Sequence, residues 1–254
     1  MIKGIDKFRE HFADHTDQYV VIGGAACDLL FEQAGLPFRA TKDFDVVLAV
    51  EVVDAAFATT FADFLESGGY QAREKSDGHK ELFRFYKPQS GDYPYMIELF
   101  SRRPKGFHLP DHIKVTRVSV EDGILSLSAI LLDDDYYGAL QDSKTVIDGI
   151  SILDETLLIP FKARAYLDLT RSRADGAEVD EKHIKKHRND VFRLLQLFPG
   201  DRQIAVSETI SADLKRFVTA IAGDENLSPK SFGVNITRTE GIKMLTAAYG
   251  IELD

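Results

Sequence analysis

The chain has no tryptophan, one cysteine, three methionines and eight prolines among its 254 residues. A single cysteine cannot form an internal disulfide, which argues against a small disulfide-stapled fold. No run of eighteen apolar residues occurs, so no transmembrane helix is expected. The first fifteen residues are charged and lack the apolar centre of a signal peptide. These absences predict a cytoplasmic protein with no membrane partner.

The chain also carries no excess of positively charged residues. The formal net charge is −10, which argues against indiscriminate binding to nucleic acid. Residues 162–196 differ, because nine Lys and Arg stand there against six Asp and Glu. This basic segment could hold the phosphates of an NTP or an RNA backbone. A solvated helix face is the simpler account of most of its individual charges.

The most informative feature present is a pair of aspartates inside an apolar run. Asp43 and Asp45 flank Phe44 in the segment DFDVVLAV. Residues i and i+2 of a strand lie on the same side, so the two carboxylates would project together. Their repulsion is relieved by a divalent cation such as Mg²⁺. In the alternative, Asp43 caps a turn and Asp45 is exposed at the start of an edge strand, as in many isolated Asp-x-Asp matches.

A glycine turn precedes these aspartates. Residues 20–22 are a β-branched run, Gly23 and Gly24 interrupt it, and residues 25–33 have helical apolar spacing. A strand, a glycine turn and a helix N-terminus together leave backbone N–H groups where an anion can approach. The glycine turn and the aspartates therefore predict the phosphate end and the metal end of one nucleotide pocket.

A third carboxylate stands alone in a later apolar segment. Glu98 lies in the middle of YMIELF, residues 95–100. A lone glutamate is costly to bury unless it is paired or bound to a metal. The alternative is an edge strand on which Glu98 faces water.

The glycine turn, the following helix and TKDFDVVL resemble the signature of the nucleotidyltransferase fold shared with DNA polymerase β. In that fold a Gly-Gly or Gly-Ser turn is followed by Asp-x-Asp and by a third carboxylate on a later strand. The resemblance implies that Asp43, Asp45 and Glu98 are catalytic ligands of Mg²⁺ or Mn²⁺. It also implies that Gly23 and Gly24 contact the phosphates of ATP or another NTP.

Arg39 is a further candidate for nucleotide binding. It lies shortly before the aspartates in FRATKD, where it could contact a phosphate, although a loop arginine is normally solvated. The sequence also departs from the common pattern of the fold, because Gly24 stands where many members have serine.

A second resemblance covers the segments LLIPFKARAYLDL and HIKKHRNDVFRLL, at residues 157–169 and 183–195. They resemble the C-terminal half of the AbiEii/AbiGii group of nucleotidyltransferase-like toxins from bacterial toxin–antitoxin pairs. The resemblance implies that Lys162 binds the triphosphate and that Asp190 orients Lys162. From the residues alone, Lys162 borders an apolar helix stripe and could extend to solvent. Asp190 could equally form a surface ion pair with Lys186, four residues earlier.

Two other clusters are interpreted as ordinary surface features. Asp133 to Asp135 lack the glycine and the distal glutamate of a calcium loop, so a helix surface is expected. His183 and His187 have zinc-ligand spacing but lack the glutamate of the HExxH motif. They are expected to be surface histidines.

The order of elements predicts an α/β (α+β) fold, in which an N-terminal nucleotidyltransferase-type mixed sheet flanked by helices precedes a mainly helical C-terminal region. The expected domains are 1–125, which would be catalytic, and 126–254, which would carry Lys162. Strands are predicted near 20–22, 41–48, 70–75, 81–86, 94–100, 114–120, 123–127 and 145–152. Helices are predicted near 4–18, 25–33, 51–67, 128–141, 154–172, 180–197, 206–222 and 237–248.

The predicted activity is magnesium-dependent transfer of NMP from an NTP to an acceptor hydroxyl. Resemblance to the toxin group makes the 3′ end of tRNA the leading acceptor and implies a cognate antitoxin as partner. Two alternatives remain open: an NTP-binding regulatory protein of the same fold without catalysis, and a transferase that modifies a small molecule such as an antibiotic. The sequence does not specify the NTP, the acceptor or the role of residues 201–254.

Overall fold

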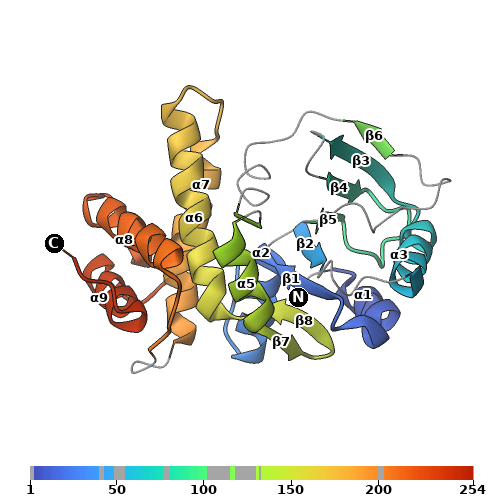
Figure 1. Cartoon of the computed structure of the whole chain (residues 1–254), viewed down its shortest axis with the longest axis horizontal. Helices are drawn as coiled ribbons and strands as arrows, with labels where there is room; N and C mark the ends of the chain where they lie inside the picture. The colour runs from blue at the N-terminus through green and yellow to red at the C-terminus, as the bar shows by residue number, and fades with distance from the viewer. Residues whose placement is uncertain are drawn as a thin grey trace. The chain divides into compact units, whose positions relative to one another are not determined.

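The computed structural model describes residues 3–39, 43–48, 55–76, 81–101, 115–117, 130–131, 133–198 and 203–253. The chain divides into two compact units (Figure 1). Unit 1 comprises Met1–Val120 and Lys144–Asp154, and unit 2 comprises Glu121–Ser143 and Glu155–Asp254. Among the described residues, no helix has both the length and the apolar character that crossing a membrane requires.

Unit 1 is built on a mixed sheet. In the described residues the sheet has eight strands in the order β6-β3-β4-β5-β2-β1-β8-β7. Parallel pairs are β1 with β8, β2 with β5 and β3 with β6, and the remaining neighbours are antiparallel. The strands are β1 Tyr19–Ile22, β2 Asp43–Leu48, β3 Gln71–Ser76, β4 Glu81–Tyr86, β5 Met96–Ser101, β6 Val115–Arg117, β7 Lys144–Ile147 and β8 Ile150–Leu153.

Aromatic side chains attach helices to one face of this sheet. The helices of unit 1 are α1 Ile5–Phe12, continued by the 3₁₀ turn η1 Ala13–His15, α2 Gly23–Gln33 and α3 Ala55–Gly68. Phe8 of α1 lies 4.4 Å from the ring of Phe12 and meets the Phe44 ring edge-on at 4.6 Å. Phe64 of α3 and Phe8 are 5.8 Å apart, centroid to centroid. Because aromatic rings bury large apolar areas, phenylalanine fills the core of a chain that has no tryptophan.

Unit 2 is helical in the residues described. Its helices are α5 Asp134–Asp142, α6 Glu155–Ala174, α7 Glu181–Leu194 with η3 Leu195–Leu197, α8 Glu208–Ala222, η4 Pro229–Phe232 and α9 Arg238–Tyr249. Helix α6 packs against both α7 and α8 (Figure 1). Side-chain oxygens begin several helices, as at Asp180 and at Thr237, which forms a capping box with Glu240.

The structure confirms the α+β class, with a mixed sheet and helices followed by a mainly helical region. The predicted strand at 145–152 is instead the hairpin β7–β8, with φ of 49° at Asp148 and 75° at Gly149. An Asp-Gly pair suits the tight turn in which both central residues have positive φ. The predicted helix at 4–18 is shorter, because Gly4 has φ of 82° and α1 ends at Phe12. The strand predicted at 123–127 lies outside the described residues.

Candidate active site

Asp43 and Asp45 occupy alternate positions of β2, as the pattern predicts. Phe44, between them, is fully buried and packs against Phe8 of α1. Because alternate residues of a strand belong to opposite faces, positions 43 and 45 belong to the face opposite α1. Strand β2 lies between β5 and β1, so the alternative of an edge strand is wrong.

Backbone register brings the predicted features onto adjacent strands. Asp45 is directly paired with Ile22, the last residue of β1, and on its other side with Glu98 of β5. Gly23, the residue after Ile22, begins α2. The register therefore aligns the glycine turn, the second aspartate and the third carboxylate across three neighbouring strands.

The glycine pair forms the first turn of α2, two residues before the predicted start of that helix. Gly23 has φ of 74°, a left-handed conformation that glycine adopts without steric cost. Ile22 at the N-cap offers no polar side chain, and the first turn of α2 contains no acidic residue. A helix begins with N–H groups that have no partner inside the helix, and this start favours an anion.

Glu98 is buried rather than exposed at an edge. Strand β5 lies between β4 and β2, and the Glu98 side chain is 7% exposed. Its Oε1 accepts a hydrogen bond from Nε of Arg84 at 2.8 Å, and Nη2 of Arg84 lies 2.5 Å from the same oxygen in an ion pair. Arg84 is the register partner of Glu98 on β4. The alternative in which Glu98 faces water is therefore wrong.

Sequence reasoning missed Arg84, although a signal was present. Arg84 has apolar or aromatic neighbours on both sides in ELFRFY, as Glu98 does in YMIELF. Two isolated opposite charges on strands joined by a short connection are candidates for a cross-strand pair. Pairing them requires a register that the sequence leaves open.

The described contact of Arg39 is with an aromatic ring. Its guanidinium lies 5.1 Å from the ring centre of Phe38, and the Phe38 ring lies 5.0 Å from that of Phe31 on α2. Residues 40–42, which connect Arg39 to Asp43, are outside the described part of the chain. A phosphate contact for Arg39 stays a prediction.

Lys162 and Asp190 are in contact within unit 2. Lys162 Nζ lies 3.2 Å from Asp190 Oδ2, and the two side chains are 6% and 0% exposed. Asp190 Oδ1 also accepts a 3.1 Å hydrogen bond from Arg193 Nη1. Lys162 therefore does not extend to solvent, and the Asp190 carboxylate is buried rather than exposed on the surface. Whether Lys162 binds a triphosphate stays a prediction.

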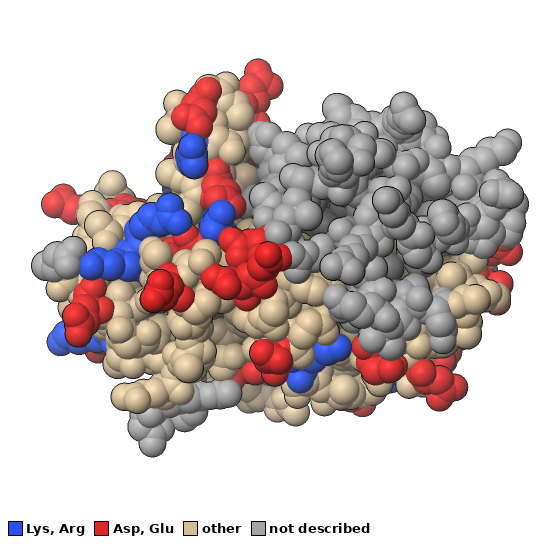
Figure 2. Space-filling model, viewed as in Figure 1, with Lys and Arg blue, Asp and Glu red and all other residues tan. Residues whose placement is uncertain are grey.

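The predicted basic segment is largely balanced by its own acids. Arg164 and Asp168 are 3.1 Å apart, and Lys185 and Glu181 are 2.6 Å apart. Figure 2 shows Lys and Arg interspersed with Asp and Glu on the described surface in view, rather than forming one basic face. This arrangement favours the solvated-helix interpretation for most of these charges.

A second buried carboxylate lies in unit 2. Asp213 of α8 is fully buried and accepts hydrogen bonds from Tyr136 Oη at 3.0 Å, from Arg164 and from Arg216. Burial, followed by the nearby Asp213 charge, raises the pKa of Tyr136 above its ordinary value. Every hydrogen bond of this network joins residues of unit 2, so it is interpreted as part of the core.

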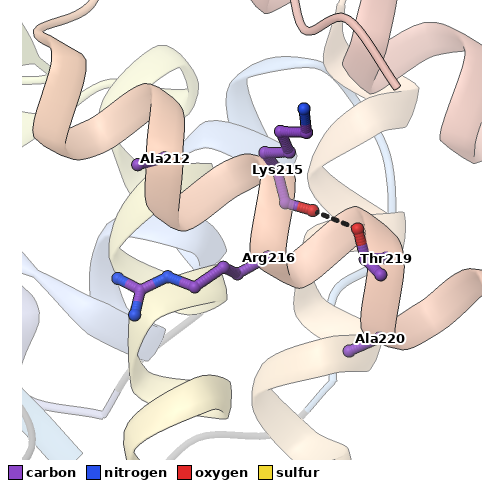
Figure 3. A pocket seen from close by; sticks show the side chains of 5 residues that line it. All are labelled: Ala212, Lys215, Arg216, Thr219 and Ala220. Atoms are coloured by element: carbon purple, nitrogen blue, oxygen red, sulfur yellow. Dashed lines mark hydrogen bonds between the residues drawn. The ribbon is translucent and has the colours of Figure 1, made fainter. Parts of the chain in front are cut away.

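A depression on the surface of α8 also lacks the features of a site. It is lined by Ala212, Lys215, Arg216, Thr219 and Ala220, all from one helix (Figure 3). The Thr219 hydroxyl donates to the Lys215 carbonyl of the same helix at 2.9 Å, and the Lys215 and Arg216 side chains extend in different directions. No convergent set of polar groups is formed by these five residues.

The remaining clusters are surface features only in part. Asp133 caps α5 by accepting from the backbone N–H groups of Asp135 and Tyr136. His183 is exposed on α7 as predicted, whereas His187 is partly buried and its Nδ1 atom is buried. Among the side chains that the structure describes, no three His, Cys, Asp or Glu lie together as a metal site. The side chains of Asp43 and Asp45 are not among those described.

No protein-family model and no curated protein sequence matches the chain. Among solved structures, an antigenic nucleotidyltransferase-like protein from Paracoccidioides brasiliensis is similar at 16% identity, covering 98% of this chain and 96% of that one, with a TM-score of 0.44. The antibiotic-resistance factor ANT(2'')-Ia is similar at 12% identity over 87% and 93% of the two chains, with a TM-score of 0.40.

A structure of Cid1 with its short product ApU is more distant, at 10% identity over 87% and 65% of the chains and a TM-score of 0.29. All three TM-scores are below 0.5, so these similarities assign no activity to this chain. By their names, none of the three is a toxin of the AbiEii/AbiGii group.

Proposed function

We propose that the chain is a metal-dependent nucleotidyltransferase that transfers NMP from an NTP to an acceptor hydroxyl and releases pyrophosphate. The observation that carries the proposal is the register of β1, β2 and β5, which aligns Ile22, Asp45 and Glu98 across the sheet. Carboxylate oxygens are the donors that Mg²⁺ and Mn²⁺ prefer, and the α2 N-terminus beside them favours phosphate.

Each residue has a proposed role. Asp43 and Asp45 hold the cations, and Glu98 supplies the third carboxylate. When bound, the cations offset triphosphate charge and lower the pKa of the acceptor hydroxyl. The backbone N–H groups of Gly23 and Gly24 bind the β- and γ-phosphates.

Unit 2 contributes Lys162 to this proposal. The lysine would add positive charge to the bound triphosphate, while Asp190 holds its ammonium at 3.2 Å. We propose the 3′ end of tRNA as acceptor and a toxin with a cognate antitoxin as the biological role. Both rest on the resemblance of the α6 and α7 segments to the AbiEii/AbiGii group.

A binding protein without catalysis is the second candidate, and one observation favours it. Arg84 already pairs with Glu98, and such a pair can neutralise the third carboxylate without a metal ion. A protein of this kind would bind NTP and transfer nothing. A small-molecule transferase is the third candidate, and it differs only in the acceptor.

Transfer of label from α-³²P NTPs tests the proposal. Each of the four NTPs is incubated with the chain, Mg²⁺ or Mn²⁺, and cellular RNA, protein or small-molecule acceptors. We expect the wild type to label an acceptor, and Asp43→Ala to lose the labelling while retaining NTP binding. Asp92→Ala is the matched control, because Asp92 is an exposed acid of the same unit.

The outcomes separate the candidates. NTP binding without transfer by the wild type, under every condition, would overturn the enzyme and favour the binding protein. Labelled tRNA together with growth arrest on expression supports the toxin. Labelled aminoglycoside together with growth protection supports the small-molecule transferase.

A further inference from the structure

Arg84 and Glu98 belong to a row of residues that crosses four strands. Register pairs Arg84 of β4 with Glu98 of β5, Glu98 with Asp45 of β2, and Asp45 with Ile22 of β1. The row therefore runs from a cation through two carboxylate positions to the start of α2. Directly paired residues of neighbouring strands belong to the same face of a sheet.

The opposite face of the same strands is apolar and filled. Phe85, Ile97 and Leu99, the neighbours of Arg84 and Glu98 along the chain, are all fully buried. Phe85 meets the ring of Phe61 on α3 at 5.6 Å. Alternation therefore places Arg84 and Glu98 on the face that positions 43 and 45 share.

Two nitrogens of the Arg84 guanidinium contact the Glu98 carboxylate. Nε and Nη2 of Arg84 lie 2.8 and 2.5 Å from Oε1. Two nitrogens of one planar guanidinium orient the carboxylate and also compensate its negative charge. A lysine ammonium orients a carboxylate less well.

We propose that Arg84 is a positioning residue of the metal site, holding Glu98 by Oε1 so that its carboxylate is oriented for a cation. The inference rests on the proposed function, because it requires Glu98 to be a metal ligand. Partners that hydrogen-bond to ligating carboxylates orient them and tune affinity for the metal. Arg84 also offsets one of the three negative charges that Asp43, Asp45 and Glu98 would otherwise gather.

A purely structural ion pair explains this geometry less well. A buried ion pair commonly adds little net stability compared with apolar residues of similar size. The other face of β4 and β5 shows that apolar residues pack well in these strands. The charged pair is therefore better explained by its effect on the orientation of the Glu98 carboxylate.

In the opposite possibility, Arg84 competes with the cation for the same place. This possibility predicts the opposite change in metal affinity. If Arg84 occupied the place of the cation, its removal would strengthen metal binding. If Arg84 positions Glu98, its removal weakens metal binding. The sign of the change in metal affinity decides between them.

The test is Mn²⁺ binding to the full chain, measured by electron paramagnetic resonance for wild type, Arg84→Lys and Arg84→Gln. We expect Arg84→Gln to weaken Mn²⁺ binding about 10- to 100-fold and Arg84→Lys to be intermediate. Arg9→Gln is the matched control and should leave affinity unchanged. Arg9 is a partly exposed arginine of the same unit, bound to Asp6 at 2.6 Å and to Asp148 at 2.5 Å.

A double variant shows whether Arg84 acts through Glu98. In a Glu98→Gln background, Arg84→Gln should produce no further loss of Mn²⁺ affinity. Circular dichroism confirms folding, and Arg84→Lys keeps the test valid if Arg84→Gln does not fold. Where transfer is detected, the Mg²⁺ concentration for half-maximal rate should rise with the Mn²⁺ dissociation constant.

Each outcome has a distinct meaning. Unchanged or tighter Mn²⁺ binding by folded Arg84→Gln overturns the positioning role and leaves the proposed transferase standing. An equal loss in the Glu98→Gln background overturns it as well. A wild type that binds no Mn²⁺ with or without NTP overturns the metal-dependent transferase, and the inference with it.

Discussion

The phenolic hydroxyl of Tyr249 donates a 2.7 Å hydrogen bond to the backbone carbonyl of Thr156. This carbonyl lies four residues before Pro160, which is inside α6. Because proline has no N–H, it cannot give that carbonyl its helical hydrogen bond. A tyrosine from α9 supplies a donor instead. The contact ties the last helix of the chain to the helix that carries Lys162, and gives residues 201–254 a structural role that the sequence had left open.

Tyr249→Phe should lower the free energy of unfolding by about 1–3 kcal/mol, because a buried carbonyl loses a donor. In a Pro160→Ala background the same change should cost less, since the N–H of the new alanine can reach the Thr156 carbonyl. Urea unfolding of the four proteins measures this coupling. Equal costs in both backgrounds would contradict the explanation. Tyr95→Phe, at a half-exposed tyrosine, is the control.

Asp190→Ala should lower the free energy of unfolding by about 3–5 kcal/mol, because it leaves the buried Lys162 without its carboxylate. The double variant Lys162→Met/Asp190→Leu should lose less, since the buried Lys162 charge is removed together with its carboxylate and only the partly exposed Arg193 loses a partner. Lys185→Ala, in an ion pair whose side chains are both 53% exposed, should change stability by less than about 1 kcal/mol. Equal losses for Asp190→Ala and Lys185→Ala in urea unfolding would refute this account.

Alanine substitution of the two partners of the Asp213–Arg216 ion pair should lower the free energy of unfolding by different amounts. Asp213 is fully buried and accepts from three side chains, whereas the Arg216 side chain is 65% exposed. Asp213→Ala should therefore cost about 3–5 kcal/mol of unfolding free energy, and Arg216→Ala less than about 1 kcal/mol. Thermal unfolding compares them. A larger loss from Arg216→Ala than from Asp213→Ala would be the contrary result.

Stability should fall at alkaline pH partly through Tyr19. Its side chain is fully buried, and burial raises its pKa to about 12, against a partial lowering by the Ser151 N–H hydrogen bond. The folded state thus favours the neutral phenol. The contribution of this phenol to the free energy of unfolding is complete below pH 10 and is lost as pH rises toward 12. The free energy of unfolding would fall by about 2–3 kcal/mol in total from this group.

Urea unfolding at a series of pH values tests the Tyr19 contribution. Tyr19→Phe should show a shallower decline in unfolding free energy above pH 10 than the wild type does. The difference between the two proteins is the relevant quantity, because burial raises the pKa of Tyr70 and Tyr136 as well. Parallel declines would show that Tyr19 ionises equally in both states.

Local patterns predicted most of the elements. The run at 20–22, the aspartate segment and the helices near 154–172 and 206–222 correspond to β1, β2, α6 and α8. Errors occurred where one or two residues set a boundary. The Asp148–Gly149 turn divides a predicted strand, and the positive φ of Gly4 shortens a predicted helix. Such boundaries depend on backbone conformations that apolar periodicity does not record.

The burial of Lys162 could not be predicted in the same way. Its place on the border of an apolar stripe is compatible with both solvent and core. Asp190, on the next helix, decides the matter by presenting a buried carboxylate at 3.2 Å. Contacts of this kind depend on how α6 and α7 pack.

The amino-acid pattern alone establishes that Asp43 and Asp45 share one face of a strand, because side chains alternate along any strand with a period of two. It also establishes that a glycine turn precedes them and that Glu98 stands alone among apolar residues. The pairing of Glu98 with Asp45 on one side and Arg84 on the other follows only from the folded sheet. Strand register is set by pairing between distant segments, and one residue of slip would move Glu98 to the opposite face.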